Sequence, residues 1–144
     1  MVPLSLANTQ SLIPKHLTIP VSLVISPQKR KFINIMLDSG ATGNFLDITL
    51  AKNLGVSFFK KILPEPVRAV DGSELSSGLI THQTQELTMI CDNGHSESII
   101  FDLIDTPLFG AILGVPWLQK HNPQIDWFKR LVTLNSSFCF HSCY

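Results

Sequence analysis

Hydrophobic and polar residues alternate along the first part of the chain as they do in a β-strand. Every second residue of Leu17–Ile25 is apolar, and a period of two is typical of a strand with one buried face. Pro20 in this strand predicts either a bulge or an N–H side that faces outward. After a turn at Ser26–Gln28, the run Phe32–Leu37 predicts the returning strand of a hairpin. The basic run Lys29–Lys31 between them is interpreted as a solvated turn.

Further short apolar runs predict additional strands. Nine prolines and eight glycines break the sequence into short segments, which favours a strand-rich fold. Asp71-Gly72 is a strong signal for a two-residue hairpin turn, and Asp92-Asn93-Gly94 predicts another turn. The expected strands are Val67–Ser76 (two short runs around Asp71), Leu79–Gln85, Glu86–Cys91, Ser98–Ile104, Ile125–Phe128 and Leu131–Leu134.

Two short helices are predicted from their end signals. The first has Asp47 as its N-cap, leucines at fourfold spacing and Gly55 just past its end. The second begins at Pro116 and stops before Pro123. His121, in the last turn of the second helix, is expected to cap the final carbonyl groups.

The order of strand, glycine-containing loop and short helix occurs twice, around Gly40 and around Gly114. The first copy has Asp38 directly after its apolar strand. The second copy has only Ile112 and Leu113 at that place, without an acid. The two copies therefore differ in the group that could do acid–base chemistry.

Composition limits the classes of function. The 144 residues are 44% hydrophobic and 15% charged, which fits one domain with a substantial core. Eleven Lys+Arg balance eleven Asp+Glu, so broad electrostatic binding to nucleic acid or to an anionic membrane is not expected. No apolar run approaches the roughly 20 residues that span a bilayer. Three cysteines do not make a disulfide framework, and we expect an intracellular protein without a nucleic-acid or membrane partner.

Asp38 is the sharpest candidate for chemistry. A carboxylate at the end of an apolar strand is costly to place without hydrogen-bond partners. It is followed by Ser39, Gly40, Ala41 and Thr42, which are small or carry a hydroxyl. Taken alone, Asp-Ser-Gly most often caps a turn, so its context decides its interpretation.

Three ordered segments resemble the retroviral-type aspartic proteases (retropepsins) of gypsy-class retrotransposons. Residues 37–47 are similar to their active-site segment and residues 66–72 to their flap. Residues 112–123, followed by Ile125-Asp126-Trp127, are similar to their C-terminal signature. The segments most resemble the sushi-class elements of vertebrates and the domesticated genes derived from them, over about residues 16–143.

The resemblance implies a mainly β fold: a retropepsin-like closed barrel with one or two short helices and one lobe per chain. We expect residues 1–15 to be a mobile arm, residues 16–135 the protease domain and residues 136–144 a Cys-containing tail. The family acts as a homodimer with one catalytic Asp from each chain. A two-fold axis would place Asp38 opposite its copy, which supplies the second carboxylate that this chain lacks.

The resemblance also assigns roles to individual residues. Asp38 would be catalytic, and the Ser39 hydroxyl would hydrogen-bond across the dimer axis. Gly40 lets the backbone approach the carboxylates. The complete expected set is the active-site loop Ser39, Gly40, Ala41 and Thr42; the flap and substrate-binding residues Ala69, Val70, Asp71 and Gly72; and the second-loop packing residues Ile112, Leu113 and Gly114.

The function implied is hydrolysis of extended peptide segments, in polyprotein processing, by a water activated between two Asp38 carboxylates. No metal or organic cofactor is expected, because water is the nucleophile and the carboxylate pair handles the proton. The expected place is the cytoplasm or a retrotransposon virus-like particle. The alternative is a domesticated, catalytically weak or silent domain that keeps the fold as a dimerisation or peptide-binding module.

Cys139, His141 and Cys143 raise the question of a zinc site. They could bind zinc with a fourth ligand such as His95 or Cys91, but their spacing is unlike that of common zinc sites. We therefore expect a reduced, unligated tail.

Three residues of the C-terminal signature are assigned to structure. Trp117 and Trp127 are expected in the core from their positions in the family, and Asp126 is expected to be structural.

Overall fold

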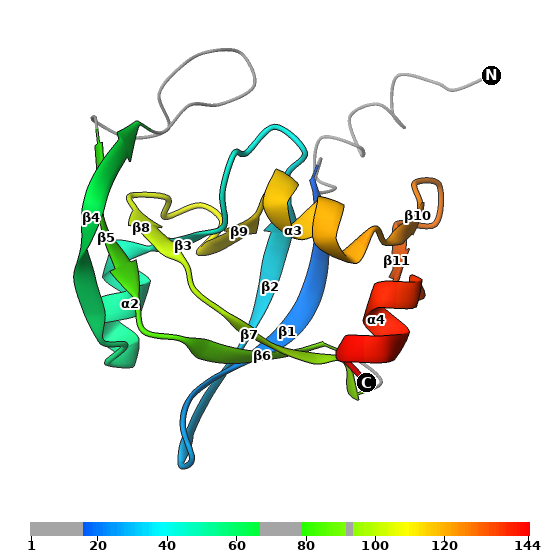
Figure 1. The fold of residues 1–144 in the computed structure, drawn as a ribbon, viewed down its shortest axis with the longest axis horizontal. Helices are drawn as coiled ribbons and strands as arrows, with labels where there is room; N and C mark the ends of the chain where they lie inside the picture. The colour runs from blue at the N-terminus through cyan, green and yellow to red at the C-terminus, as the bar shows by residue number, and fades with distance from the viewer. Residues whose placement is uncertain (1–15, 67–78, 92–93) are drawn as a thin grey trace, which may run out of the picture.

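The computed structural model describes residues 16–66, 79–91 and 94–144, which form two sheets and three short helices (Figure 1). The strands of the large sheet are β1 (Leu17–Ser26), β2 (Lys29–Leu37), β3 (Phe45–Asp47), β4 (Phe58–Pro66), β5 (Leu79–Thr84), β6 (Leu87–Cys91), β7 (Ser96–Ile99), β8 (Asp102–Ile104) and β9 (Ala111–Leu113). The small sheet pairs β10 (Gln124–Asp126) with β11 (Leu131–Thr133). The helices are α2 (Ile48–Leu54), α3 (Val115–His121) and α4 (Ser137–Ser142). The predicted mainly β fold is confirmed.

The large sheet is strongly curled, with the strand order β4-β5-β8-β3-β9-β2-β1-β6-β7. Figure 1 shows α2 beside β4 and β5 at one side, and α3, α4 and the small sheet toward the other. This curling gives a half-barrel around a common core.

The predicted first hairpin is confirmed, with β1 and β2 paired in antiparallel register from Leu17↔Leu37 onward. The interpretation of Lys29–Lys31 as part of the turn is wrong, because these residues belong to β2. Their side chains are exposed at the turn end of the hairpin, so charge does not prevent pairing there. The register continues through Pro20 without a shift, and the irregularity lies between Val24 and Ser26. A bulge at Pro20 is therefore excluded.

The predicted strand Ser98–Ile104 is two strands. β7 pairs with β6, whereas β8 pairs with β3 and β5 in a distant part of the sheet. Half-exposed Ile100 and fully buried Phe101 lie between them. The apolar run is continuous in the sequence, so its pattern does not reveal the break.

Strand β4 was not predicted. It lies at one edge of the sheet and pairs only with β5 within the described ranges. Most of its side chains are exposed, and it contains Lys60, Lys61, Pro64 and Pro66. Lysine and proline are common on edge strands because they oppose pairing with another chain. The same residues hide the alternation that would identify a strand.

Both predicted helices are confirmed with their end signals. The Asp47 carboxylate accepts a hydrogen bond from the Leu50 N–H at 3.1 Å, as an N-cap does. Gly55 ends α2 in the left-handed region, at φ 73°. Helix α3 ends at Asn122, which adopts φ 42°.

The core confirms one predicted tryptophan position and overturns the other. Trp117 is 2% exposed and packs in the main hydrophobic cluster. Trp127 is 70% exposed, so its predicted core position is wrong. It follows the short strand β10, and the small sheet does not cover it. Asp126 has the predicted structural role, because its carboxylate accepts the Lys129 N–H at 2.9 Å.

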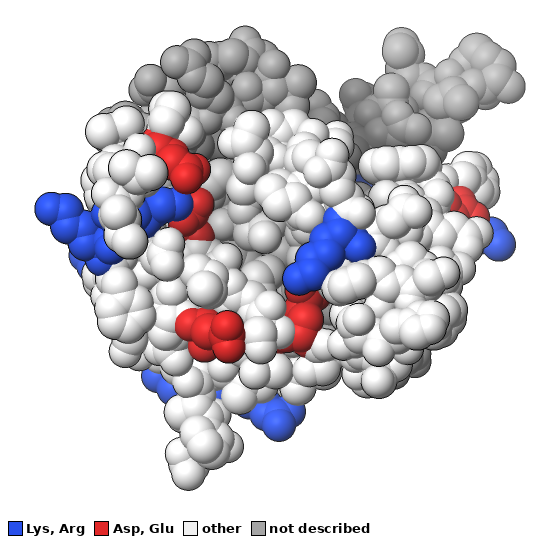
Figure 2. Space-filling model, viewed as in Figure 1, with Lys and Arg blue, Asp and Glu red and all other residues white. Residues whose placement is uncertain are grey.

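The segment expected as a tail contains helix α4, in which the Ser136 hydroxyl caps the Cys139 N–H at 3.2 Å. Acidic and basic side chains are interspersed on the face shown in Figure 2. Across residues 16–66, 79–91 and 94–144, no helix is long and apolar enough to cross a membrane.

Candidate active site

The two strand–loop–helix copies lie side by side. β2 and β9 run parallel, with Met36 opposite Ile112 and Leu37 opposite Leu113. The Asp38 N–H donates to the Leu113 carbonyl at 2.9 Å. Asp38 therefore emerges from the sheet at the same level as Gly114, which begins the second loop.

Local hydrogen bonds shape the loop that carries Asp38. Its Oδ1 accepts the Gly40 N–H at 2.9 Å, and its carbonyl accepts the Ala41 N–H at 3.1 Å. These bonds hold the carboxylate over the turn. Asp38 is half-buried, Ala41 is fully buried, and Ser39 and Thr42 are exposed. The turn thus presents one carboxylate and two hydroxyls at the surface.

Gly114, in the second copy, supports the loop that carries Asp38. Its N–H donates to Asn44 Oδ1 at 3.1 Å, and the next N–H, of Val115, donates to the Ala41 carbonyl at 2.8 Å. A Cβ atom at Gly114 would lie 2.5 Å from the Ala41 carbonyl oxygen, closer than real contacts allow. The predicted packing role of the second loop thus has a steric basis in this structure.

Asp47 joins helix α2 to the loop between β8 and β9. Its buried carboxylate caps α2 with one oxygen and accepts the Thr106 N–H at 2.9 Å with the other. Its own N–H donates to the Gly110 carbonyl at 2.7 Å. The loop between β8 and β9 is therefore held beside Asp38.

This loop forms one wall of a depression of about 370 Å³ that includes Asp38. Of the described residues that line it, Asp38 and Asp105 carry carboxylates. The remaining lining is mostly apolar: His16, Met36, Thr106, Pro107, Leu108, Phe109 and Ile112. A polar group in an open, apolar depression is the usual arrangement of a binding site.

A second depression of about 210 Å³ meets the first at Asp38. It is lined by Asp38, Ser39 and His16 together with Leu17, Leu37, Leu118, Ile125 and Trp127. Asp38 is thus at the junction of two open, largely apolar surfaces.

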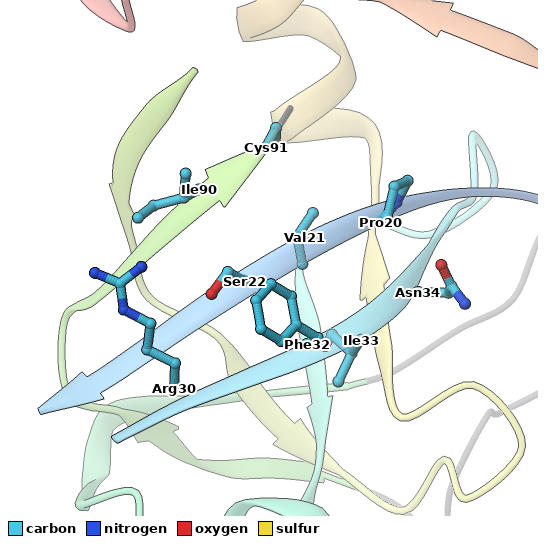
Figure 3. Close-up of a pocket in the computed structure, with 9 residues that line it drawn as sticks. All are labelled: Pro20, Val21, Ser22, Arg30, Phe32, Ile33, Asn34, Ile90 and Cys91. Atoms are coloured by element: carbon cyan, nitrogen blue, oxygen red, sulfur yellow. The ribbon is translucent and has the colours of Figure 1, made fainter. Parts of the chain in front are cut away.

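A third depression, of about 510 Å³, lies elsewhere (Figure 3). It lies over β1, β2 and β6 and is lined by residues that include Arg30, Phe32 and Cys91. None of its described lining residues carries a carboxylate. It therefore lacks the acid–base groups of an aspartic protease.

The predicted flap residues Ala69, Val70, Asp71 and Gly72 lie outside the described residues. The strand ends on either side of them are described, and Pro66 of β4 pairs with Leu79 of β5. Residues 67–78 therefore connect two antiparallel strands that are already paired.

The C-terminal cysteines lie in a second constellation. Cys139 and Cys143 are buried beside His95, which precedes β7, and His121, the last residue of α3. His141 is exposed, and its Nδ1 contacts the Ser137 carbonyl oxygen at 2.8 Å.

His121 was predicted to cap the last carbonyl groups of its helix. The structure instead places its buried ring between Glu97 and Cys139, with Nε2 3.0 Å from Glu97 Oε1 and Nδ1 3.4 Å from Cys139 Sγ. The spacing of Cys139 and Cys143 was the available signal for this cluster. Residues four apart share one face of a helix, whereas His141, two positions from each cysteine, lies on another face.

Burial also changes the titration of this second constellation. Burial, followed by the nearby His121, lowers the pKa of His95. Burial raises the pKa of the Cys143 thiol to about 11, with Cys139 the next contributor. Both shifts favour the neutral forms of the His95 imidazole and the Cys143 thiol.

Comparison with known proteins decides the family. A sequence model of the PEG10/RTL1 protease domain matches residues 34–143. This chain belongs to the PEG10/RTL1 protease-domain family. The match begins just before Asp38 and extends past the second loop and its helix. The paired strands β2 and β9, and the two loops that follow them, therefore belong to the family's domain.

A solved structure supports the fold of this PEG10/RTL1-type domain. The chain is similar to the retroviral protease-like domain of Ddi1 from Leishmania major, with 15% sequence identity and a TM-score of 0.53. The similarity covers 88% of this chain and 90% of that chain. The predicted retropepsin-like fold is confirmed.

Proposed function

We propose that this PEG10/RTL1-type domain is an aspartic endopeptidase that acts as a homodimer. Asp38 from each chain forms the catalytic pair, and the substrates are extended peptide segments, including the junctions of its own precursor.

One observation carries the proposal. Asp38 and Gly114 directly follow two parallel strands and lie at the same level, and of these two equivalent positions only the first carries a carboxylate. An aspartic protease needs two carboxylates about 3 Å apart that share a proton. Since the second copy within the chain has no acid at this place, a second molecule supplies the partner. A two-fold axis next to Asp38 brings the two identical residues together.

The carboxylate pair has a defined chemical role in this proposal. The ionised Asp38 takes a proton from a water, and that water attacks the scissile carbonyl carbon. The protonated Asp38 of the other chain donates a hydrogen bond to the carbonyl oxygen, where negative charge develops. The tetrahedral intermediate then collapses: the C–N bond breaks, and the proton that the first Asp38 took from the water passes to the leaving amine. No metal or organic cofactor enters these steps.

The surface around Asp38 fits a dimer interface. Ser39 is exposed, so its hydroxyl is available to a second chain. Trp127, 70% exposed, lines the depression that contains Asp38 and Ser39, together with Leu118 and Ile125. Burial of such an apolar surface favours association.

The adjoining depression fits an apolar side chain of the substrate. Met36, Leu108, Phe109 and Ile112 line it beside Asp38, and Leu108 is 87% exposed. Residues Ala69–Gly72 would close over the peptide as a flap, from the paired ends of β4 and β5.

The decisive experiment is cleavage of a precursor that contains this domain. We expect the wild type to cleave and Asp38→Asn to be inactive, because an amide cannot act as the base. Asp105→Asn is the matched control, since Asp105 lines the same depression without a place in the pair. We expect it to change the rate by several-fold at most. Full turnover by Asp38→Asn would refute the proposal.

The alternative is a silent dimerisation or peptide-binding module, as the domesticated ancestry of the family allows. It predicts that wild type and Asp38→Asn dimerise and bind peptide equally and that neither cleaves. Cleavage rates measured over a range of protein concentrations separate weak dimerisation from a lack of catalytic activity. If the active enzyme is an obligate dimer, its cleavage rate rises more steeply than linearly at low protein concentration.

A further inference from the structure

Four buried side chains converge at the junction of three segments that are distant in the sequence. His95 comes from the turn before β7, His121 from the end of α3, and Cys139 and Cys143 from α4 and its C-cap. The first three are 0% exposed and Cys143 is 6% exposed. One nitrogen or sulfur of each lies within 4.8 Å of those of the other three.

The individual distances are close to those of a tetrahedral metal site. His95 Nε2 lies 3.3 Å from Cys139 Sγ. His121 Nδ1 lies 3.4 Å from Cys139 Sγ and 4.0 Å from Cys143 Sγ. Zinc bonds of about 2.0–2.1 Å to nitrogen and 2.3 Å to sulfur place tetrahedral ligand atoms roughly 3.3–3.8 Å apart. A small inward movement of the ligands would complete this geometry.

A buried carboxylate orients one of the imidazoles. Glu97 Oε1 lies 3.0 Å from His121 Nε2, and Glu97 Oε2 accepts the Trp117 Nε1–H at 2.9 Å. A proton on Nε2, donated to Glu97, leaves the lone pair of His121 Nδ1 facing the two sulfurs. A carboxylate bonded to the second ring nitrogen is the usual support of a metal-binding histidine.

The backbone also ties these segments together. The Ser96 N–H donates to the Cys143 carbonyl at 2.8 Å, and the Cys91 N–H donates to the His95 carbonyl at 2.7 Å. The C-terminal end of α4 is thus fixed to the strand that follows His95. His95 and Cys143 therefore lie on segments that backbone hydrogen bonds join to each other and to β6.

We propose that His95, His121, Cys139 and Cys143 form a structural zinc site. Two sulfurs and two imidazole nitrogens are the donor set that Zn²⁺ takes in closed structural sites, and four protein ligands leave no position for a substrate. The ion would bond α3, α4 and the β6–β7 turn into one unit. This inference is independent of protease activity.

The test uses the full chain, purified without chelator, with Zn²⁺ as the probe. We expect one zinc per chain by elemental analysis, and charge-transfer absorption bands from thiolates bound to Co²⁺ after exchange. Zinc in excess should raise the midpoint of thermal unfolding of the metal-free chain by about 5–10 °C. Absence of bound zinc, of the Co²⁺ bands and of the thermal shift would overturn the proposal.

Variants identify the ligands. Cys139→Ser and Cys143→Ser should lower the bound zinc at least tenfold. Cys91→Ser and His141→Ala should keep it, because Cys91 is a buried thiol outside the cluster and His141 is an exposed residue of α4. Full zinc in both ligand variants, or a Cys139–Cys143 disulfide in the native chain, would overturn the site. If a ligand variant fails to fold, the wild-type Co²⁺ spectrum still decides.

Discussion

Gly114 lies against the carbonyl oxygen of Gly43 so closely that no side chain fits between them. The contact joins the start of α3 to the loop that carries Asp38. Because the opposing atoms are backbone, a side-chain rotation cannot make room. The loop that carries Asp38 and the loop that begins at Gly114 must therefore move apart if Gly114 is replaced.

Gly114→Ala should destabilise the domain by about 2–3 kcal/mol, the upper part of the range for an overpacked site. Urea unfolding measures this change. Gly43→Ala is the matched comparison, since its Cβ would meet a phenylalanine side chain at 3.2 Å rather than backbone. We expect a smaller loss there. Equal stability of Gly114→Ala and wild type would show that the loops are not locked together.

Trp127→Ala should weaken dimerisation without unfolding the monomer, because its side chain is largely exposed beside Asp38. Sedimentation over a range of concentrations should show a dissociation constant at least tenfold higher. Phe128→Ala is the control: Phe128 is 94% exposed and does not line either depression with Asp38. An equal effect of both variants would place the interface elsewhere.

Asp47→Ala should lower the free energy of unfolding by about 2–4 kcal/mol, because it removes an N-cap and a second charge-assisted hydrogen bond to the Thr106 N–H. Asp47→Asn keeps one acceptor oxygen and should lose about half as much. Chemical denaturation of the two variants tests this order. An unchanged free energy of unfolding in Asp47→Ala would contradict this prediction and would mean that water replaces both hydrogen bonds.

Ser39→Ala should weaken the dimer by about 1 kcal/mol for each neutral hydrogen bond lost across the axis. Because Ser39 is exposed in the single chain, the stability of the monomer should not change. Sedimentation and urea unfolding of the same variant separate the two effects. A loss of monomer stability alone would contradict a role across the dimer axis.

The rate of cleavage should depend on pH as a bell with its maximum on the acidic side of neutral. Two carboxylates in contact titrate as a coupled pair, and only the singly protonated pair has both a base and an acid. Activity should fall at low pH as the base is protonated, and at high pH as the shared proton is lost. A statine inhibitor should block cleavage where thiol alkylators and chelators added during the assay do not. A rate that rises steadily into alkaline pH would contradict the mechanism.

The sequence predicted most elements of this fold because their signals are local. Asp47 and Gly55 mark the ends of α2, and alternation identifies β1. The likeness of the two strand–loop–helix copies was also visible. Their parallel pairing through Met36↔Ile112 was not, since no local pattern encodes which distant strands become neighbours.

The remaining differences have similar causes. The break between β7 and β8 depends on two different pairing partners, which a continuous apolar run does not reveal. Trp127 was predicted in the core from its position in the family, and only the structure shows that its side chain is 70% exposed. The cluster of His95 with His121 and Cys139 requires three segments to meet, so chain spacing alone did not identify it.

The bond from Asp38 to Leu113 also has a consequence for the order of folding. The turn that carries Asp38 gains this bond only after strands β2 and β9, which are separated by more than half of the chain, have paired. Long-range pairings of this kind form slowly, because a large loop must be closed before any contact stabilises it. A nascent chain that has not yet emerged as far as Leu113 therefore carries Asp38 without the strand that supports it. Under the proposed function, such a delay would keep an active site from forming before the whole domain has been synthesised and folded.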